Sequence, residues 1–219
     1  MKVMVLAAGR GERLRPLTDA TPKPLLEVKG KPLIVHHLER LRDAGYTHIV
    51  INTSWLAEQI HDSLGDGKRW GVSLQYSYEG PEPLETGGGI FKSLPLLGRQ
   101  PFLVVNGDIY TEYPFENLKR VLKPDDLAHL VMVPNPKHHP KGDFHLSAMG
   151  RLRLEGGPRL TYSGIGIYRP ELFKDCRAGK FPLLPLLQNA MLTEGLGGER
   201  YNGRWSDVGT LDSLKAANN

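Results

Sequence analysis

Residues Val3 to Leu25 read VMVLAAGRGERLRPLTDATPKPL, and the prediction of the fold starts from this stretch. Its first residues, Val3 to Leu6, form an apolar run that predicts a short, fully buried strand. Residues 7–13 are too rich in glycine and charge to form a helix, so they predict a loop directly after that strand. Further along, Lys23 stands between two prolines, whose rings restrict the backbone and help to aim its ammonium group.

The loop and the lysine carry groups that suit a phosphate chain. Gly9 and Gly11 let the backbone approach a ligand closely and leave amides free to bind an anion. Arg13 adds a fork of donors that matches phosphate geometry, and Lys23 adds a point charge. The Gly-x-Gly pattern alone is weak evidence, because Leu14 replaces the third glycine of the dinucleotide fingerprint and no Gly-Lys-Ser/Thr triplet follows. The whole constellation predicts a polyphosphate site.

Length and composition narrow the class of protein. The 219 residues suffice for one domain with a sizeable core, and 40% hydrophobic and 24% charged residues are ordinary for a soluble protein. No apolar run is long enough to cross a membrane, and no signal peptide is visible. A net charge of +4 without a basic block does not indicate nucleic-acid binding. The single cysteine, Cys176, fits a reducing compartment, so we expect a cytoplasmic protein.

Strands and helices alternate along the first part of the chain. The hydrophobic spacing predicts helices over 31–44, 55–64 (capped by Ser54) and 87–94, and strands over 48–52, 74–78 and 101–105. This alternation predicts an α/β fold, Rossmann-like, with a mostly parallel, doubly wound sheet. From residue 131 the pattern changes to short strands and turns, which predict a small mixed β part. It contains a strand over 131–133, short strands within 145–168, a helix over 182–190, a last strand over 201–205 and a helix over 211–217.

Three further segments contain candidate site residues. The predicted helix over 87–94 begins with Gly87, Gly88 and Gly89. Each glycine inside a helix lowers its stability by about 1 kcal/mol compared with alanine. This cost favours a ligand lying against bare backbone over a flexible linker. Asp108 follows a buried strand, at the edge where open α/β sheets bind ligands, although an aspartate in a turn usually only stabilises the turn. Asp207 follows the predicted last strand, where its carboxylate would satisfy backbone amides at the start of the next helix.

These segments resemble the sugar-1-phosphate nucleotidylyltransferase family, as do Pro16-Leu17-Thr18, Thr21-Pro22-Lys23-Pro24-Leu25 and the element Trp205-x-Asp207-x-Gly209-Thr210. The resemblance covers essentially the whole chain. It implies a single catalytic domain over 1–219, with a nucleotide-binding half over about 1–130 and a sugar-binding half over about 131–219. It also implies a nucleoside triphosphate and a sugar 1-phosphate as substrates, and Mg²⁺ as cofactor.

The resemblance assigns roles to individual residues. It implies that Arg13, Lys23 and Asp108 are catalytic, and that Asp108 and Asp207 hold Mg²⁺. It further implies that the nucleotide is bound by Ala8, Gly9, Gly11, Glu12, Arg13, Lys23, Glu79, Thr86 and Gly87. The residues implied for sugar binding are Asn106, Gly142 and Asp143.

Within the family, two segments resemble uridylyltransferases that act on N-acetylmuramate 1-phosphate in bacterial cell-wall recycling. They are Glu82–Phe91 and the Asn135-Pro136-x-His138-His139-x-x-Gly142-Asp143-Phe144 segment. The resemblance therefore implies UTP as the nucleotide. The glutamine that the family usually places near the nucleotide base is absent here, and Glu79 is the nearest replacement. Its carboxylate could accept the N3–H of uracil or thymine, whereas cytosine offers no donor there. The usual Glu-Lys-Pro is also absent around 155–158, which leaves Lys141 and Arg159 as candidate cations for the sugar phosphate.

Several other readings stay open. A glucose-1-phosphate or mannose-1-phosphate nucleotidylyltransferase, or a cytidylyltransferase acting on phosphocholine, would share the same site. A non-catalytic regulatory subunit that binds a sugar nucleotide is the alternative outside enzymes, and the retained Arg13, Lys23, Asp108 and Asp207 argue against it. His138 and His139 could ligate zinc, but no cysteine or third spaced ligand accompanies them, so a loop covering the sugar phosphate is favoured. The oligomeric state stays open, and a monomer is compatible with the sequence.

Overall fold

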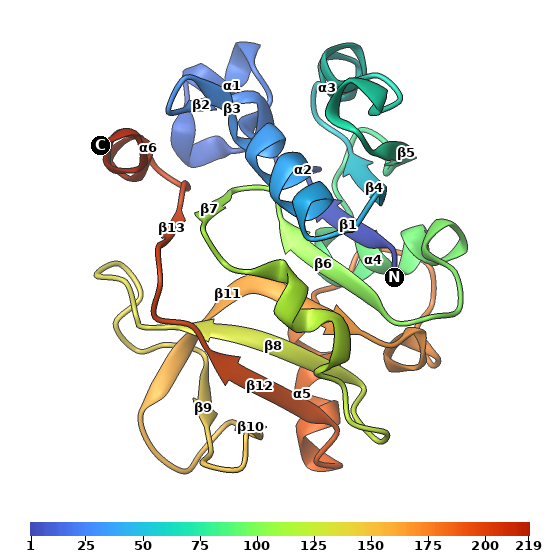
Figure 1. The fold of residues 1–219 in the computed structure, drawn as a ribbon, viewed down its shortest axis with the longest axis vertical. Coiled ribbons are helices and arrows are strands. Elements are labelled where there is room, and N and C mark those ends of the chain that lie inside the picture. The colour runs from blue at the N-terminus through green and yellow to red at the C-terminus, as the bar shows by residue number, and fades with distance from the viewer.

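The computed structural model describes residues 1–219 and contains one large sheet with helices on both faces (Figure 1). The nine strands of the sheet are β1 (Val3–Leu6), β4 (His48–Thr53), β5 (Ser73–Tyr78), β6 (Phe102–Asn106), β8 (Ala128–Val133), β9 (Phe144–Leu146), β10 (Leu152–Arg153), β11 (Arg159–Tyr168) and β12 (Leu196–Arg200). The helices are α1 (Leu17–Ala20), α2 (Leu33–Asp43), α3 (Ala57–Leu64), α4 (Glu85–Leu97), α5 (Leu184–Leu192) and α6 (Leu211–Asn218). None of the helices is long and apolar enough to span a membrane.

The sheet is parallel on the N-terminal side and mixed on the other. Strand β1 lies between β4 and β6, and β4 continues to β5, all in parallel. Strand β11 then pairs antiparallel with both β6 and β8, while β12 pairs parallel with β8. The predicted α/β fold with a mostly parallel sheet and a smaller mixed part is therefore confirmed.

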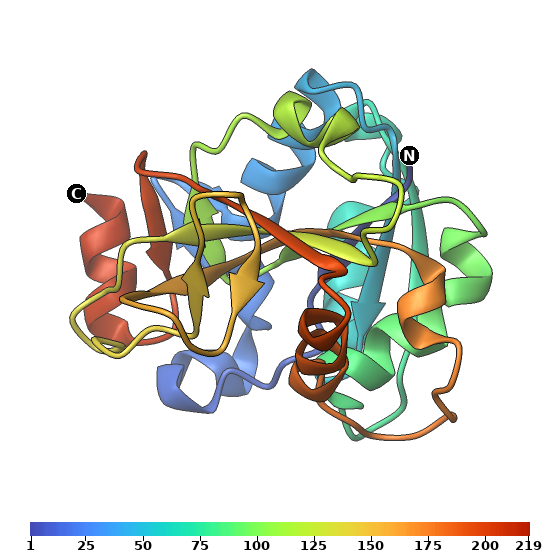
Figure 2. The same cartoon turned by 90° about the horizontal axis from the view of Figure 1, so that it is seen from below.

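The two faces of the sheet belong to two hydrophobic cores because neighbouring residues of a strand point in opposite directions. On β1, Val3 and Val5 belong to the core that includes α2 and α3, whereas Met4 belongs to the core that includes α4 and α5. Figure 2 shows α2 and α5 on opposite sides of the sheet. The continuous apolar run of β1 therefore reflects burial of the strand on both faces.

Three sequence predictions were wrong in detail. No strand covers 201–205; instead β12 ends at Arg200 and a short strand, β13 (Trp205–Asp207), follows. The predicted helix over 31–44 begins only at Leu33, because Lys31–Pro32 is β3 of a hairpin with β2 (Glu27–Val28). Ser54 does not cap α3; its hydroxyl donates to the Gly80 carbonyl, which leaves the helix to start after Leu56.

The three glycines at the start of α4 lie where other parts of the chain pack closely against the helix. A Cβ on Gly87 would lie 2.6 Å from the Phe181 ring, and one on Gly88 would overlap the Gly179 carbonyl oxygen. A Cβ on Gly89 would overlap the Glu79 carboxylate. The segment 179–181 and the Glu79 side chain therefore occupy the space that side chains on α4 would need.

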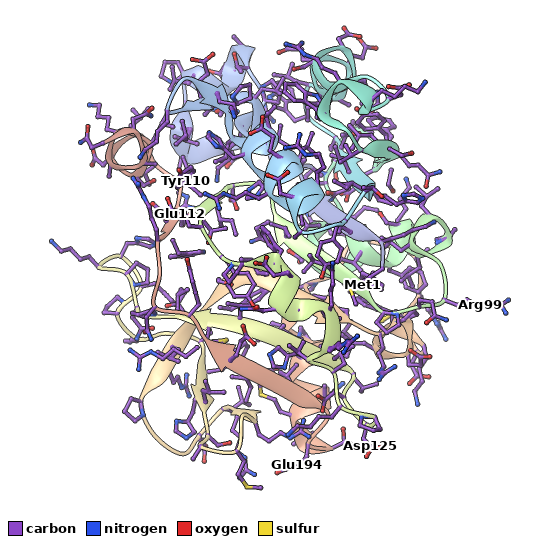
Figure 3. The ribbon with its side chains drawn as sticks, viewed as in Figure 1. Met1, Arg99, Tyr110, Glu112, Asp125 and Glu194 are labelled. Atoms are coloured by element: carbon purple, nitrogen blue, oxygen red, sulfur yellow. The ribbon has the colours of Figure 1, made fainter.

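A small third core lies under the strand that follows Asp108. It consists of Val28, Leu33, Tyr110, Val208 and Ala217, and Figure 3 labels Tyr110 beside α6. Strand β7 (Ile109–Thr111) pairs antiparallel with β13 there, so the C-terminal segment packs against the N-terminal hairpin. This cluster holds the two chain segments that carry the predicted metal-binding aspartates.

His37 of α2 should make the protein sensitive to mild acid. The residue is buried, and burial lowers its pKa from 6.5 to about 4. Because the unfolded chain then binds more protons between pH 6.5 and 4, the free energy of unfolding should fall by up to about 3 kcal/mol as the pH drops through this range. Denaturant unfolding of the protein and of His37→Leu at several pH values would test this. A stability difference between the two that does not change with pH would contradict it.

Candidate active site

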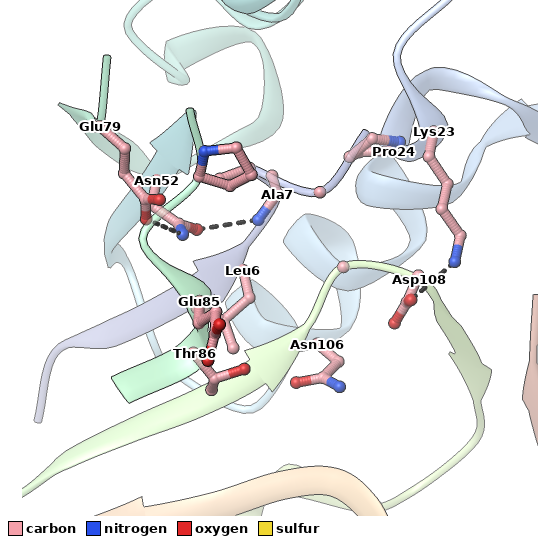
Figure 4. Close-up of a pocket in the computed structure, with 14 residues that line it drawn as sticks. Leu6, Ala7, Lys23, Pro24, Asn52, Glu79, Glu85, Thr86, Asn106 and Asp108 are labelled. Atoms are coloured by element: carbon pink, nitrogen blue, oxygen red, sulfur yellow. Dashed lines mark hydrogen bonds and ion pairs between the residues drawn. The ribbon is translucent and has the colours of Figure 1, made fainter. Parts of the chain in front are cut away.

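A cavity of about 200 Å³ opens at the carboxyl ends of β1, β4 and β6 (Figure 4). Its lining comes from the glycine loop, the strand ends and the start of α4. The lining residues are Leu6, Ala7, Ala8, Gly9, Lys23, Pro24, Asn52, Glu79, Pro83, Glu85, Thr86, Asn106, Gly107 and Asp108. This is the edge at which open α/β sheets bind ligands, because loops from several strands meet there.

Lys23 and Asp108 meet inside this cavity, as Figure 4 shows. The Lys23 ammonium donates to Asp108 Oδ2 over 2.6 Å, and the lysine is buried while the Asp108 side chain is 38% exposed. Pro22 precedes the short 3-10 helix Lys23–Leu25, and Pro24 lies within it, so the chain direction around the lysine is restricted. A positive charge is thus held beside a carboxylate that can still reach a ligand.

Asn52 and Glu79 form a buried network on the other side of the cavity. The Asn52 amide donates to Glu79 Oε1 over 2.6 Å, and its oxygen accepts from the Ala7 backbone over 2.8 Å. Glu79 Oε2 accepts from the Leu84 backbone over 2.6 Å. The network therefore ties the glycine loop to the segment before α4. An ionised carboxylate has about four acceptor sites, so Glu79 can still accept a donor from a ligand.

A second cavity of about 270 Å³ adjoins the first, and Asn106 and Asp108 line both. The remaining residues of its wall come from β7, β11, β13 and the loop after β8. They are Ile109, His138, His139, Asp143, Thr161, Tyr162, Ser163, Gly164, Trp205 and Asp207. The Trp205 indole donates to the Ser163 carbonyl over 2.9 Å, which fixes β13 against β11. Two substrates bound in these cavities would meet at Asp108.

Asp108 and Asp207 lie close together because β13 pairs with β7. In that pairing Asp207 is opposite Ile109, and the Val208 backbone donates to the Asp108 carbonyl over 2.8 Å. Both carboxylates line the second cavity. Mg²⁺ is usually held by one or two carboxylates together with water and substrate phosphates, so this pair of oxygen donors fits it.

Arg13 lies beside Asp207 rather than in either cavity. A Cβ on Gly209 would lie 2.6 Å from an Arg13 guanidinium nitrogen and 2.9 Å from Asp207 Oδ1. The guanidinium of Arg13 and the carboxylate of Asp207 thus both lie against the Gly209 backbone. The arginine of the glycine loop is therefore brought to the C-terminal segment, next to one of the two predicted metal ligands.

Comparison with known proteins now identifies the family. A family model described as "Nucleotidyl transferase" matches residues 2–146. The chain belongs to the nucleotidyl transferase family. It is 53% identical to an N-acetylmuramate alpha-1-phosphate uridylyltransferase of Neisseria meningitidis serogroup B, over 99% of this chain and 96% of the relative. A protein of the same name from Caulobacter vibrioides is 36% identical, over 98% and 94%.

More distant similarities agree with this assignment. A mannose-1-phosphate guanyltransferase beta-B of Xenopus laevis is 37% identical, over 95% of this chain and 61% of the relative. Among solved structures, a candidate glucose-1-phosphate thymidylyltransferase from Bacillus anthracis covers 100% of this chain and 94% of its own, with a TM-score of 0.84 and 24% identity. That structural similarity supports the fold.

The residues predicted to bind substrates are divided between lining and supporting positions in this nucleotidyl transferase. Seven line the first cavity: Ala8, Gly9, Lys23, Glu79, Thr86, Asn106 and Asp108. Asp143 and Asp207 line the second cavity. Gly11, Glu12, Arg13, Gly87 and Gly142 line neither. A Cβ on Gly11 would lie 2.9 Å from Thr18, and one on Gly142 would lie 2.6 Å from Asn135, so these two glycines serve loop packing.

Other lining residues were not predicted. Asn52, at the end of an apolar strand, is the clearest omission, and its place after the run Ile49–Ile51 resembles that of Asp108 after β6. Thr161, Tyr162 and Ser163 come from β11, where no motif marks them. Conversely, Lys141 and Arg159, the candidate cations for the sugar phosphate, line neither cavity.

Proposed function

We propose that this nucleotidyl transferase transfers UMP from UTP to N-acetylmuramate 1-phosphate, giving UDP-N-acetylmuramate and pyrophosphate. The observation that carries the proposal is the 53% identity, over nearly the whole of both chains, to the Neisseria uridylyltransferase. The adjoining cavities support it, because a transfer between two substrates needs two sites that share a boundary. We place the reaction in the cytoplasm, in the re-use of cell-wall sugars.

We propose that residues 1–219 act as one catalytic unit with a nucleotide side and a sugar side. The first cavity, built mainly from residues before 109, would take UTP, with Glu79 accepting the N3–H of uracil. The second, built largely from residues after 131, would take the sugar phosphate. Asn106 and Asp108 belong to both cavities, which supports a reaction centre at their boundary.

The chemistry is an in-line displacement at the α-phosphorus of UTP. An oxygen of the sugar phosphate attacks the phosphorus, and the bond to the pyrophosphate oxygen breaks. Because both reactants are anionic, the protein's main tasks are charge neutralisation and alignment. No side-chain nucleophile is needed, since the attacking phosphate is already ionised.

We assign the neutralising roles to residues near this boundary. Lys23 would stabilise the charge around the α-phosphate. Arg13 lines neither cavity, and from its place beside Asp207 it would steady the triphosphate. Asp108 and Asp207 would hold Mg²⁺, which when bound supplies a positive charge to phosphate oxygens. On the sugar side, Asn106 and Asp143 would bind hydroxyl or amide groups, since both face that cavity.

A screen of substrate pairs tests the proposal. N-acetylmuramate differs from N-acetylglucosamine by a lactyl ether whose carboxylate is negative at neutral pH. We expect kcat/KM, measured by pyrophosphate release, to be highest for UTP with N-acetylmuramate 1-phosphate, and at least about tenfold lower with N-acetylglucosamine 1-phosphate. Glucose 1-phosphate used equally well would contradict this substrate assignment. A preference for GTP with mannose 1-phosphate would favour the activity named for the Xenopus relative.

A further inference from the structure

The second cavity, here termed the sugar-side cavity, carries an unusual set of charges for a site that would accept a sugar phosphate. Its acidic and basic lining residues are three aspartates, Asp108, Asp143 and Asp207, and two histidines, His138 and His139. No lysine or arginine lines it. An anion in this cavity needs a paired positive charge, because an unpaired charge removed from water is costly. Apart from a metal at Asp108 and Asp207, the histidines are the side chains of the wall that can supply one.

The two histidines have different neighbours. His138 Nε2 lies 3.5 Å from Asp207 Oδ2, so His138 belongs to the metal side of the cavity. His139 lines only the sugar-side cavity and has no contact with Asp108 or Asp207 among its polar interactions. The reacting phosphate belongs at the boundary of the two cavities, near Lys23 and Asp108. His139 is therefore available for a different anionic group of the sugar.

The His139 ring is held from one side. Its Nε2 lies 3.0 Å from Asp143 Oδ1, while Asp143 Oδ2 accepts from the Tyr162 backbone over 2.8 Å. Asp143 is thereby anchored to β11 and fixes the direction of the ring. The other ring nitrogen, Nδ1, makes no hydrogen bond within the protein, and the side chain is 40% exposed. An imidazolium donates from both nitrogens, so Nδ1–H can bind a ligand while Nε2–H binds Asp143.

We infer that His139, in its protonated form, binds the carboxylate of the acidic sugar substrate, and that Asp143 is the positioning residue that aims it. The inference rests on the proposed function and names the residue that selects the acidic sugar over its neutral counterpart. A charge-assisted hydrogen bond of this kind is about twice as strong as a neutral one and is lost when the sugar has no carboxylate.

The test compares the sugar 1-phosphates of N-acetylmuramate and N-acetylglucosamine in matched variants, with UTP and Mg²⁺ saturating. We expect His139→Gln, which keeps a donor but no charge, to lower the ratio of the two kcat/KM values about tenfold, mainly through the KM of the acidic sugar. His139→Lys should restore the ratio. Lys141→Gln removes a charge from the same loop outside the cavity, so it should leave the ratio unchanged.

Rescue by lysine separates a charge role of His139 from a purely structural one. Lysine keeps a positive charge but not the imidazole ring, so a preference restored in His139→Lys depends on the charge. The other acidic and basic groups lining this cavity, Asp108, Asp143, Asp207 and His138, are common to both proteins.

The outcomes separate this inference from the proposed function. If the unmodified protein does not prefer the acidic sugar, the substrate assignment fails. If it does and His139→Gln keeps the full preference, or loses activity equally with both sugars, the role of His139 is overturned while the substrate assignment stands.

Discussion

Replacing Asp108 with asparagine is expected to lower turnover at least about a hundredfold while the protein stays folded, because the carboxylate that would hold the charge-neutralising Mg²⁺ is lost. Asp108 lines both cavities, pairs with Lys23 and lies beside Asp207 across the β7–β13 pairing. The amide has nearly the same shape as the carboxylate but no charge for Mg²⁺. Steady-state kinetics over a range of Mg²⁺ concentrations would measure the loss, with circular dichroism as the check on folding.

A matched control for this substitution is Asp125→Asn. Asp125 is exposed, lines neither cavity and lies far from Tyr110 in Figure 3. We expect its turnover and Mg²⁺ dependence to equal those of the unmodified protein. Near-normal turnover in folded Asp108→Asn would remove Asp108 from the metal site and leave Asp207 to be tested alone.

Lys23→Ala is expected to lower kcat by about a hundredfold or more and to change the KM for UTP much less. Only interactions that are stronger in the transition state than in the ground state accelerate the chemical step. The buried Lys23 ammonium, 2.6 Å from Asp108, lies where negative charge would develop at the α-phosphate. Separate determination of kcat and KM would test the prediction, with exposed Lys174→Ala as the control.

A raised KM with unchanged kcat would instead make Lys23 a residue that binds ground state and transition state equally. Because Lys23→Ala also leaves Asp108 without its partner, the comparison should include Lys23→Arg. That variant keeps a positive charge but changes its geometry, since guanidinium is planar and broader than ammonium.

The sequence predicted the parts of the site whose residues lie close together along the chain. Three such parts are the buried run of β1, the loop after it and Lys23 between two prolines. They are neighbours in the sequence, so local patterns were enough to predict them, and the structure contains all three. Asp108 was found because a polar residue after an apolar strand lies at the sheet edge. Glu79 was also placed at the cavity, but its link to Asn52 was not foreseen.

Other features depend on contacts between distant segments. Strand β12 was missed because its sequence, LGGER, has low strand propensity. The structure gives the reason for its glycines: a Cβ on Gly197 would lie 2.9 Å from the His129 ring, and one on Gly198 would lie 2.7 Å from Leu152. Packing against β8 and β10 thus overrides local preference. Likewise, Gly87 and Gly88 of α4 accommodate Phe181 and Gly179, contacts that the sequence pattern did not reveal.

The sequence by itself determined the α/β class, the glycine loop and the place of Asp108 after a buried strand, because these depend on burial patterns along short stretches of chain. Only the tertiary structure decided which of those groups meet. The pairing of β7 with β13 brings Asp207 beside Asp108, and the loop after β8 brings His139 into the sugar-side cavity. The proximity of these residues depends on strand register and on packing between segments far apart in the chain, which local patterns do not encode.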